Sequence, residues 1–215
     1  QSYPTDPAYH EETFTSRATL TGNDFGNWYP ATKSGMKFED HDADGVKDAE
    51  DHGLADWTIY VDYDNDGVLD EGEPSAVTAA NGTYTITGIV PGTWKVKEVA
   101  QAGWTQSYPT DPAYHEETFT SRAALTGNDF GNWYPATKSG MKFEDHDADG
   151  VKDAEDHGLA DWTIYVDYDN DGVKDGGEPS AVTGADGSYT ITGIDPGTWK
   201  VKEVAQAGWT NSYPA

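Results

Sequence analysis

The 215-residue chain has no cysteine, few basic residues and no long apolar run. Without cysteine there can be no disulfide staple and no thiolate ligand or nucleophile. Only 13 lysine and arginine residues stand against 39 acidic residues, a formal net charge of -26, which argues against a nucleic-acid partner. Adaptation to high salt would produce the same balance. No run of about 18 apolar residues occurs, so we expect no membrane span in this region.

What the chain does contain is a 105-residue unit, present twice. When Gln1 is aligned with Gln106, seven positions differ: Thr19/Ala124, Leu69/Lys174, Glu71/Gly176, Ala79/Gly184, Asn81/Asp186, Thr83/Ser188 and Val90/Asp195. Residues 211–215 begin the unit a third time, so the chain resembles an excerpt from a longer tandem array. One unit is long enough for one domain with a modest core.

Each unit contains two acidic loops whose side-chain oxygens are spaced like calcium ligands. The second loop, 62–73, has carboxylates at positions 1, 3, 5, 9 and 12 and Gly67 at position 6. This spacing matches the EF-hand loop at every specified position. The first loop, 40–51, differs by ending on Asp51, which is one methylene shorter than the expected glutamate. We therefore expect the first loop to bind more weakly or to have a different shape.

Calcium explains this spacing because it takes six to eight oxygens and a short loop wraps around it by turning at a glycine. Without a cation, two carboxylates about 4 Å apart repel by roughly 4 kcal/mol at an effective dielectric of about 20. A solvated acidic surface loop is the alternative, but four loops with the same spacing favour Ca²⁺. The predicted ligands, with valine contributing its main-chain carbonyl, are Asp40, Asp42, Asp44, Val46, Asp48, Asp51, Asp62, Asp64, Asp66, Val68, Asp70, Glu73, Asp145, Asp147, Asp149, Val151, Asp153, Asp156, Asp167, Asp169, Asp171, Val173, Asp175 and Glu178.

The segments between the loops alternate with a period of two and are rich in β-branched and aromatic residues. Strands are predicted at 57–61, 83–87, 93–99 and 12–20, and helical periodicity is absent. The Asn81-Gly82 pair indicates a hairpin turn. The sequence therefore predicts an all-β fold of tandem β-sandwich modules, with the calcium loops at strand ends.

A linker-like stretch at 29–35, repeated at 134–140, suggests where one module ends. On this frame residues 34–137 form a complete module, 1–33 are the closing strands of a preceding module, and 138–215 form a second module without its closing strands. Because an incomplete sandwich exposes unpaired edges, we predict that 1–33 pairs with a region equivalent to 138–215, within the chain or in the next molecule of a fibre. The alternative is a frame in which each unit closes on itself.

A set of motifs recurs in order in both units and runs through nearly the whole unit. In the first unit they are Asp24-Phe25-Gly26-Asn27, Gly35-Met36-Lys37-Phe38-Glu39-Asp40, Gly53-Leu54, Asn81-Gly82-Thr83-Tyr84, Pro91-Gly92-Thr93-Trp94 and Gly103-Trp104. With these motifs the chain resembles the SdrD B-like repeat, a CnaB-related module of bacterial surface adhesins. The resemblance implies a prealbumin-like Greek-key sandwich, calcium in the two acidic loops, and service as a stalk. His52 and Asp51 depart from the usual proline and glutamate.

The resemblance also implies a possible covalent cross-link. Related CnaB domains can carry an isopeptide bond between a lysine on the first strand and an Asn or Asp on the last, promoted by a buried glutamate. Here Lys37 and Glu98 stand at such positions, with Asn23, Asp24 or Asn27 as candidate acceptors. A snorkelling lysine or an ordinary salt bridge is the competing interpretation.

Two functions remain open from the sequence. The first is a calcium-stiffened stalk or fibre shaft, whose partners are neighbouring copies of the same module in the chain or head to tail. The second is an adhesive module that recognises a glycan or host protein through surface aromatics, although core packing also explains the tryptophans. We expect no enzyme activity, because every tight group of carboxylates suits a cation. Calcium loops of this kind fill at extracellular concentrations, which favours a secreted or cell-surface protein.

Overall fold

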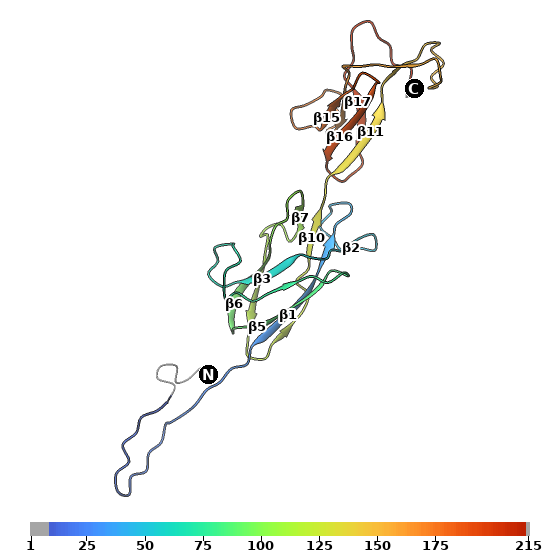
Figure 1. Cartoon of the computed structure of the whole chain (residues 1–215). Helices are drawn as coiled ribbons and strands as arrows, with labels where there is room; N and C mark the ends of the chain where they lie inside the picture. Colours follow the sequence, from blue (N-terminus) through green and yellow to red (C-terminus); the bar gives the residue numbers. More distant parts are fainter. Residues whose placement is uncertain (1–8, 214–215) are drawn as a thin grey trace. The chain divides into compact units, whose positions relative to one another are not determined.

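The structure, a computed structural model, describes residues 9–213, and these residues form strands and no helix. The all-β fold class predicted from the sequence is confirmed. The chain divides into two compact units (Figure 1). Unit 1 contains the described residues up to Asp40 together with Asp44–Ala102 and Gln106–Asn132, and unit 2 contains His41–Ala43, Gly103–Thr105 and the described residues from Trp133 onward.

Unit 1 is a sandwich of two sheets (Figure 1). The first sheet has the order β2 (His52–Gly53), β1 (Ala31–Glu39), β10 (Phe130–Trp133) and β7 (Thr105–Tyr108), and β5 (Thr83–Ile89) and β9 (Ala124–Leu125) also pair with β1. The second sheet has the order β4 (Ser75–Val77), β3 (Thr58–Asp62), β6 (Gly92–Glu98) and β8 (His115–Phe119).

The core of unit 1 lies between these sheets and follows from the period-two alternation of the strands. Val61, Val96 and Phe119 from the second sheet meet Ile86 and Phe130 from the first, and each is at most 1% exposed. Burying an apolar side chain of this size contributes about 1.5–3 kcal/mol. The strands predicted at 57–61, 83–87 and 93–99 therefore contribute to the core, together with β8 and β10.

The sandwich of unit 1 is completed by strands that belong to the second sequence repeat. β1 pairs in parallel with β10, with Lys37 opposite Phe130, and also with β9. β6 pairs antiparallel with β8, with Trp94 opposite Glu117. Residues 115–133 thus cover edges that the first repeat leaves open.

Unit 2 repeats the first part of this architecture. Its strands are β11 (Ala136–Met141), β12 (Phe143–Glu144), β13 (His157–Gly158), β14 (Thr163–Asp167), β15 (Ser180–Val182), β16 (Ser188–Ile194) and β17 (Lys200–Glu203). The register is that of unit 1, since Lys138 faces Ile191 on β11 and β16 just as Lys33 faces Ile86. Its small core contains Val166.

Unit 2 differs from unit 1 in what is covered. Val201 is 40% exposed, whereas the equivalent Val96 is fully buried and lies opposite His115 of the paired strand β8. All six residues of β11 are exposed, whereas β1 carries buried positions along its length. The described residues of unit 2 include no counterparts of β8, β9 and β10.

Two local predictions were wrong. Residues 12–20 form no strand, although the nearly identical 117–125 contributes β8 and β9, because a strand persists only where a partner satisfies its backbone hydrogen bonds. Asn81-Gly82 does form a tight turn, in which the Gly82 N–H donates to the Ala79 carbonyl at 2.8 Å. However, this turn joins β4 to β5, which lie in different sheets, so it is not a hairpin.

Candidate metal sites and a buried lysine cluster

The first acidic loop begins directly after β1, where Asp40 is fully buried. Its Oδ2 accepts a hydrogen bond from the Gly45 N–H at 2.8 Å, and the Val46 N–H donates to Asp44 Oδ1 at 2.7 Å. Carboxylate oxygens of Asp40, Asp42 and Asp44 lie within 4.8 Å of one another. The loop therefore gathers the first three predicted side-chain ligands, and the equivalent cluster in unit 2 consists of Asp145, Asp147 and Asp149.

The second loop begins at the last residue of β3, Asp62, which is 1% exposed. The Asn65 N–H donates to Asp62 Oδ1 at 2.6 Å, and the Gly67 N–H donates to Asp62 Oδ2 at 3.1 Å. Gly67 has a φ of 85°, a conformation that glycine adopts without strain. Asp62, Asp64 and Asp66 form the cluster here. In unit 2 the clusters are Asp167, Asp169 and Glu178, and Asp169, Asp171 and Asp175.

In unit 2, the carboxylate at position 12 closes each of the two acidic loops by accepting hydrogen bonds from main-chain N–H groups of the same loop. Glu178 accepts main-chain N–H bonds from loop positions 2 and 9 at 2.7 and 2.9 Å. Asp156, which ends the other loop, accepts from the same two positions, each at 3.0 Å. The shorter aspartate thus accepts the same two hydrogen bonds as the glutamate. The expected difference in shape between the two loops is not seen in these hydrogen bonds.

One oxygen in the second loop of unit 2 has no partner. Asp167 is 1% exposed, and its buried Oδ1 makes no hydrogen bond. Lys202 Nζ pairs with the other oxygen, Oδ2, at 2.7 Å, and a metal ion would give Oδ1 a partner as well. The surrounding ligands are all carboxylate oxygens, the donor type that a hard cation such as Ca²⁺ or Mg²⁺ prefers. The residues present therefore fit a hard metal ion.

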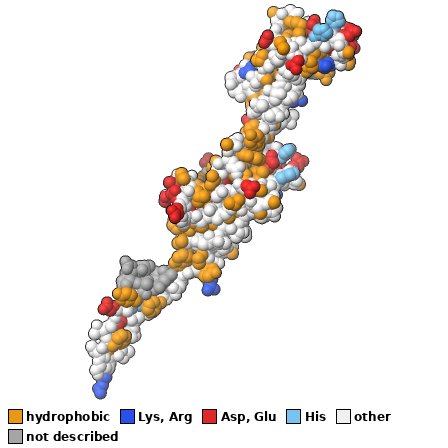
Figure 2. All heavy atoms as spheres, viewed as in Figure 1, with side chains coloured by type: hydrophobic (Ala, Val, Ile, Leu, Met, Phe, Trp, Pro, Cys, Tyr) orange, Lys and Arg blue, Asp and Glu red, His pale blue; other side chains and the backbone are white. Residues whose placement is uncertain are grey.

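Electrostatics within the second loop of unit 1 lead to the same conclusion. Figure 2 shows acidic side chains gathered in groups at the surface, and the loops hold such groups. The neighbouring Asp66 carboxylate, followed by burial and by Asp64, raises the pKa of Asp70. A raised carboxyl pKa means that the carboxylates repel one another and that a positive charge would relieve them.

A buried cluster of three polar side chains lies elsewhere in unit 1. Lys37 is fully buried, its Nζ is 3.0 Å from Glu98 Oε2, and it donates to Asn132 Oδ1. Asn132 Nδ2 donates to Glu98 Oε1 at 2.8 Å. Burial lowers the pKa of Lys37 to about 8, against the opposing effect of Glu98, and burial raises the pKa of Glu98. Burial thus disfavours the charged form of each group, and the attraction between the two charges opposes both shifts.

The acceptor residue was wrongly assigned from the sequence. Asn27 is exposed, and its equivalent one repeat later, Asn132, occupies the place beside Lys37. The reason is that β10, which carries Asn132, closes the sandwich begun by β1. An amine in contact with a side-chain amide, next to a carboxyl group, has the components needed to form an amide with loss of ammonia.

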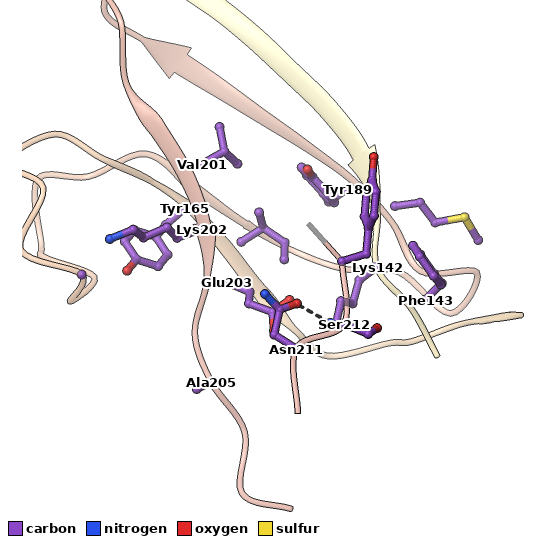
Figure 3. A pocket seen from close by; sticks show the side chains of 14 residues that line it. Lys142, Phe143, Tyr165, Tyr189, Val201, Lys202, Glu203, Ala205, Asn211 and Ser212 are labelled. Carbon is purple, nitrogen blue, oxygen red and sulfur yellow. Dashed lines mark ion pairs between the residues drawn. The ribbon is translucent and has the colours of Figure 1, made fainter. Parts of the chain in front are cut away.

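Unit 2 contains the same lysine and glutamate, but its described residues include no counterpart of Asn132, and the asparagine that lines the same pocket is Asn211. Lys142 Nζ is 2.8 Å from Glu203 Oε2, the ion pair drawn dashed in Figure 3. Both residues line a pocket of about 470 Å³ together with Val201 and Tyr189 (Figure 3). In unit 1 the equivalents of these residues are covered by β8 and β10. The pocket therefore lies where unit 1 accepts its closing strands.

Sequence reasoning missed two further lysine pairs. Lys33 is fully buried, and its Nζ lies 2.8 Å from Glu117 Oε1 and 3.0 Å from the Thr126 carbonyl. Lys97 Nζ lies 2.8 Å from Asp62 Oδ2 in the second loop. Lysines at alternate positions of apolar strands are the signal that could have revealed both pairs.

Several tryptophans serve packing in the described units. Trp57 and its equivalent Trp162 are 2% and 3% exposed. Trp94 packs on Tyr63 with ring centroids 4.7 Å apart. These three rings are therefore used in packing, whereas Trp199 and Trp209 are 40% and 46% exposed.

The two-sheet module and the paired acidic loops define a class, the tandem β-sandwich repeat with candidate cation loops. More specifically, residues 35–126 match the family model of the SdrD B-like domain, which begins within β1 and ends after β9. The family resemblance recognised from the sequence is therefore confirmed.

Named relatives agree with this family. The chain is 26% identical over 200 residues to the serine-aspartate repeat-containing protein D of Staphylococcus aureus (strain Newman), an alignment that covers 87% of this chain and 14% of that protein. It is 26% identical over 188 residues to the bone sialoprotein-binding protein of Staphylococcus aureus, covering 81% of this chain and 15% of that protein. The chain thus spans less than one sixth of these relatives.

Among solved structures, the similarity to pilins is weaker. The major pilin subunit BcpA of Bacillus cereus aligns with 14% identity and a TM-score of 0.37, covering 77% of this chain and 53% of that chain. The shaft pilin SpaA from Lactobacillus rhamnosus GG aligns with 12% identity and a TM-score of 0.34, covering 84% of this chain and 88% of that chain. In the described part of our chain, no helix has the length and apolar character needed to cross a membrane.

Proposed function

We propose that this chain is a structural segment of an extracellular or cell-surface bacterial protein, in which tandem β-sandwich modules form a stalk or fibre shaft. The main support is that the two repeats build the same strand pairs in the same register, as the Lys33/Ile86 and Lys138/Ile191 pairs illustrate. The match to the SdrD B-like domain adds to it. The proposed partners are neighbouring copies of the same module, and the proposed role includes no enzyme activity.

Calcium in the four acidic loops is the proposed source of stiffness. The clustering of carboxylate oxygens in each loop is the observation that carries this proposal, because a hard cation would relieve their repulsion, and the buried Oδ1 of Asp167, which has no hydrogen-bond partner, adds to it. At free calcium about 100 times the dissociation constant, each site would add about 2.7 kcal/mol to the stability of the fold. Four independent sites would then add on the order of 10 kcal/mol, which is comparable with the net stability of a domain.

Thermal melting of the 215-residue chain in chelator and in excess Ca²⁺ tests this proposal. We expect a higher Tm in Ca²⁺, and we expect Asp167→Asn to reduce the calcium-dependent gain. Asp161→Asn is the matched control, since Asp161 is exposed and lies outside the loops. Identical melting in chelator and in Ca²⁺ would falsify the role of calcium.

We also propose the module frame 34–137, with 1–33 and 138–215 as the closing and opening parts of neighbouring modules, although β1 itself begins at Ala31, three residues before this boundary. Support comes from β10, whose register with β1 places Phe130 opposite Lys37 in the completed sandwich. On this frame, segment 10–27 of one chain would dock onto unit 2 of another, because it differs from 115–132 only at Thr19. Copies of the chain would then associate head to tail by strand complementation.

Sedimentation over a range of concentrations tests this association. The full chain should form larger species as its concentration rises, whereas a chain without residues 1–28 should remain monomeric. Segment 29–30 is kept because the Tyr29 carbonyl accepts a hydrogen bond from the Arg122 N–H at 3.1 Å in unit 1. Equal association of both chains would contradict head-to-tail docking.

An amide between Lys37 and Asn132 is a further proposed element of the shaft. Lys37 Nζ would bond to the side-chain carbonyl carbon of Asn132, the amide nitrogen would leave as ammonia, and Glu98 would transfer the protons. The contacts among these three buried groups support it. Intact mass tests it: the chain should be lighter by one ammonia, and Lys37→Met should have the mass calculated from its sequence.

A further inference from the structure

The second acidic loop of each unit is paired with a lysine from a neighbouring strand. Lys97 of β6 places its Nζ 2.8 Å from Asp62 Oδ2, and Lys202 of β17 places its Nζ 2.7 Å from Asp167 Oδ2. Both aspartates are buried at position 1 of their loops, and both lysine side chains are at least partly covered. The same pair in two units shows that the strand register, rather than chance contact, brings the ammonium to the loop.

The geometry of this pair follows from the sheet. β3 and β6 run antiparallel with Tyr60 opposite Lys97, so the lysine stem extends beside the end of β3 where Asp62 begins the loop. Tyr165 and Lys202 are opposite each other in the same way in unit 2. The ammonium also lies near the loop glycine, since a Cβ on Gly67 would be 3.4 Å from Lys97 Nζ.

We infer that Lys97 and Lys202 act as internal counter-ions, which hold the second loops closed before metal binds and lower their affinity for it. This inference rests on the proposed binding of calcium. A fixed positive charge on Asp62 Oδ2 reduces the carboxylate repulsion that would open an empty loop. The same charge repels a divalent cation that binds to the other carboxylate oxygens. The lysines are therefore positioning residues. They keep the metal-free loop ordered, and they lower its affinity for the metal.

The inference has a consequence for the order in which the loops fill. In the first loops the position-1 carboxylates, such as Asp40, accept main-chain N–H donors as Asp62 does, but among the described residues they form no ion pair with a lysine. Loops of the second type carry both the long Glu at position 12 and the lysine charge, and these two features act in opposite directions on affinity. Removing the lysine charge should therefore strengthen binding at the second loops alone.

Calcium titration of the full chain carrying Lys97→Met and Lys202→Met tests this inference. Methionine keeps the length of the stem but removes the charge. We expect two of the four sites to bind Ca²⁺ about tenfold more tightly than in the wild type. In chelator, the double variant should melt about 4 °C lower. A merely structural role would weaken binding rather than strengthen it, so the sign of the affinity change is the decisive readout.

Two controls separate charge from packing. Lys95→Met with Lys200→Met removes the same charge from the residues directly opposite Asp62 and Asp167 in the strand register, which form no ion pair with these aspartates in the described structure. Lys95 Nζ instead lies 4.2 Å from the centroid of the Tyr114 ring, and we expect affinities within about twofold of the wild type. Lys97→Arg with Lys202→Arg keeps the charge and should restore wild-type behaviour. Unchanged or weaker calcium binding in the methionine variant overturns the inference.

The melting comparison in chelator keeps this test distinct from the test of calcium itself. If the wild type binds no Ca²⁺, the proposed calcium role fails, and the lower melting temperature of the methionine variant in chelator still supports the counter-ion role. If the methionine variant, its control and the wild type melt alike in chelator, the counter-ion role is overturned whatever the wild type binds.

Discussion

At the scale of single residues, the same lysine–glutamate pair occurs in both units but is buried to a different extent in each. Lys37 and Glu98 form a buried ion pair whose lysine is closed off by β10, whereas Lys142 and Glu203 keep side-chain exposures of 14% and 24%. The lysines also stand over equivalent tryptophans, Trp57 and Trp162, at 4.2 and 4.4 Å from the ring centroids. The difference in burial, rather than in sequence, decides what each pair contributes.

We therefore expect Lys37→Met to destabilise unit 1 by about 3–5 kcal/mol, because it leaves the Glu98 carboxylate buried without its partner. The matched variant Lys142→Met should cost less than about 1 kcal/mol, because the Glu203 carboxylate is in contact with water. Urea denaturation of the two variants measures both values. Equal losses for the two would show that burial is not the determinant.

The sequence predicted the candidate metal ligands more completely than it predicted the members of the buried lysine cluster. The carboxylate spacing of the loops depends only on local sequence, so the clusters of Asp40, Asp42 and Asp44 could be predicted. Lys37 and Glu98 could be selected as charged residues on apolar strands. The acceptor could not be selected with certainty, because Asn27 and Asn132 have the same sequence context and only the tertiary fold decides which one reaches Lys37.

At the scale of elements, the turn before β5 depends on a close backbone approach. A Cβ on Gly82 would lie 2.1 Å from the Lys37 carbonyl oxygen, and Gly82 has a φ of 80°. Gly88, within β5, has a nearly identical φ of 81° but no atom within 4 Å of the corresponding Cβ position. Substituting both glycines therefore distinguishes the cost of a steric collision, which is present only at Gly82, from the cost of backbone strain, which is present at both positions.

Gly82→Ala should destabilise unit 1 by at least about 3 kcal/mol, because the new methyl group collides with main chain that cannot move aside. Gly88→Ala should cost about 1 kcal/mol, the strain of a left-handed alanine alone. Chemical denaturation, with amide exchange in β5 as the local probe, measures both. Similar costs would mean that the chain relaxes around Gly82.

Strands could be predicted from the sequence where a segment with period-two alternation also has a neighbouring strand to pair with. Period-two patterns located β3, β5 and β6, because these strands pair with neighbours from the same repeat. The pattern at 12–20 is as clear as that at 117–125, yet only the second copy has a strand partner in the structure. Alternation reports which face a strand would bury, and it says nothing of whether the covering sheet is present.

At the scale of the whole molecule, the chain holds two copies of one closing segment in different environments. Phe119 of β8 is 1% exposed in the core of unit 1, whereas its repeat equivalent Phe14 is 76% exposed. Phe130 and Phe25 differ in the same way, at 0% and 61%. Phe14 and Phe25 are exposed, but their counterparts are buried in unit 1. Exposed apolar rings of this kind point to a docking surface similar to the one on which unit 1 buries Phe119 and Phe130.

Serine substitutions at the two equivalent phenylalanines separate folding from assembly. Phe119→Ser should cost unit 1 about 3–5 kcal/mol, because it empties a closed core. Phe14→Ser should change the stability of the dilute chain by less than about 0.5 kcal/mol, because that ring contacts solvent. If segment 10–27 docks on unit 2 of another copy, Phe14→Ser should also weaken concentration-dependent association, measured by sedimentation equilibrium. Association equal to that of the wild type would mean that the exposed ring takes no part in assembly, and a stability loss in dilute solution would mean that it is already packed within the single chain.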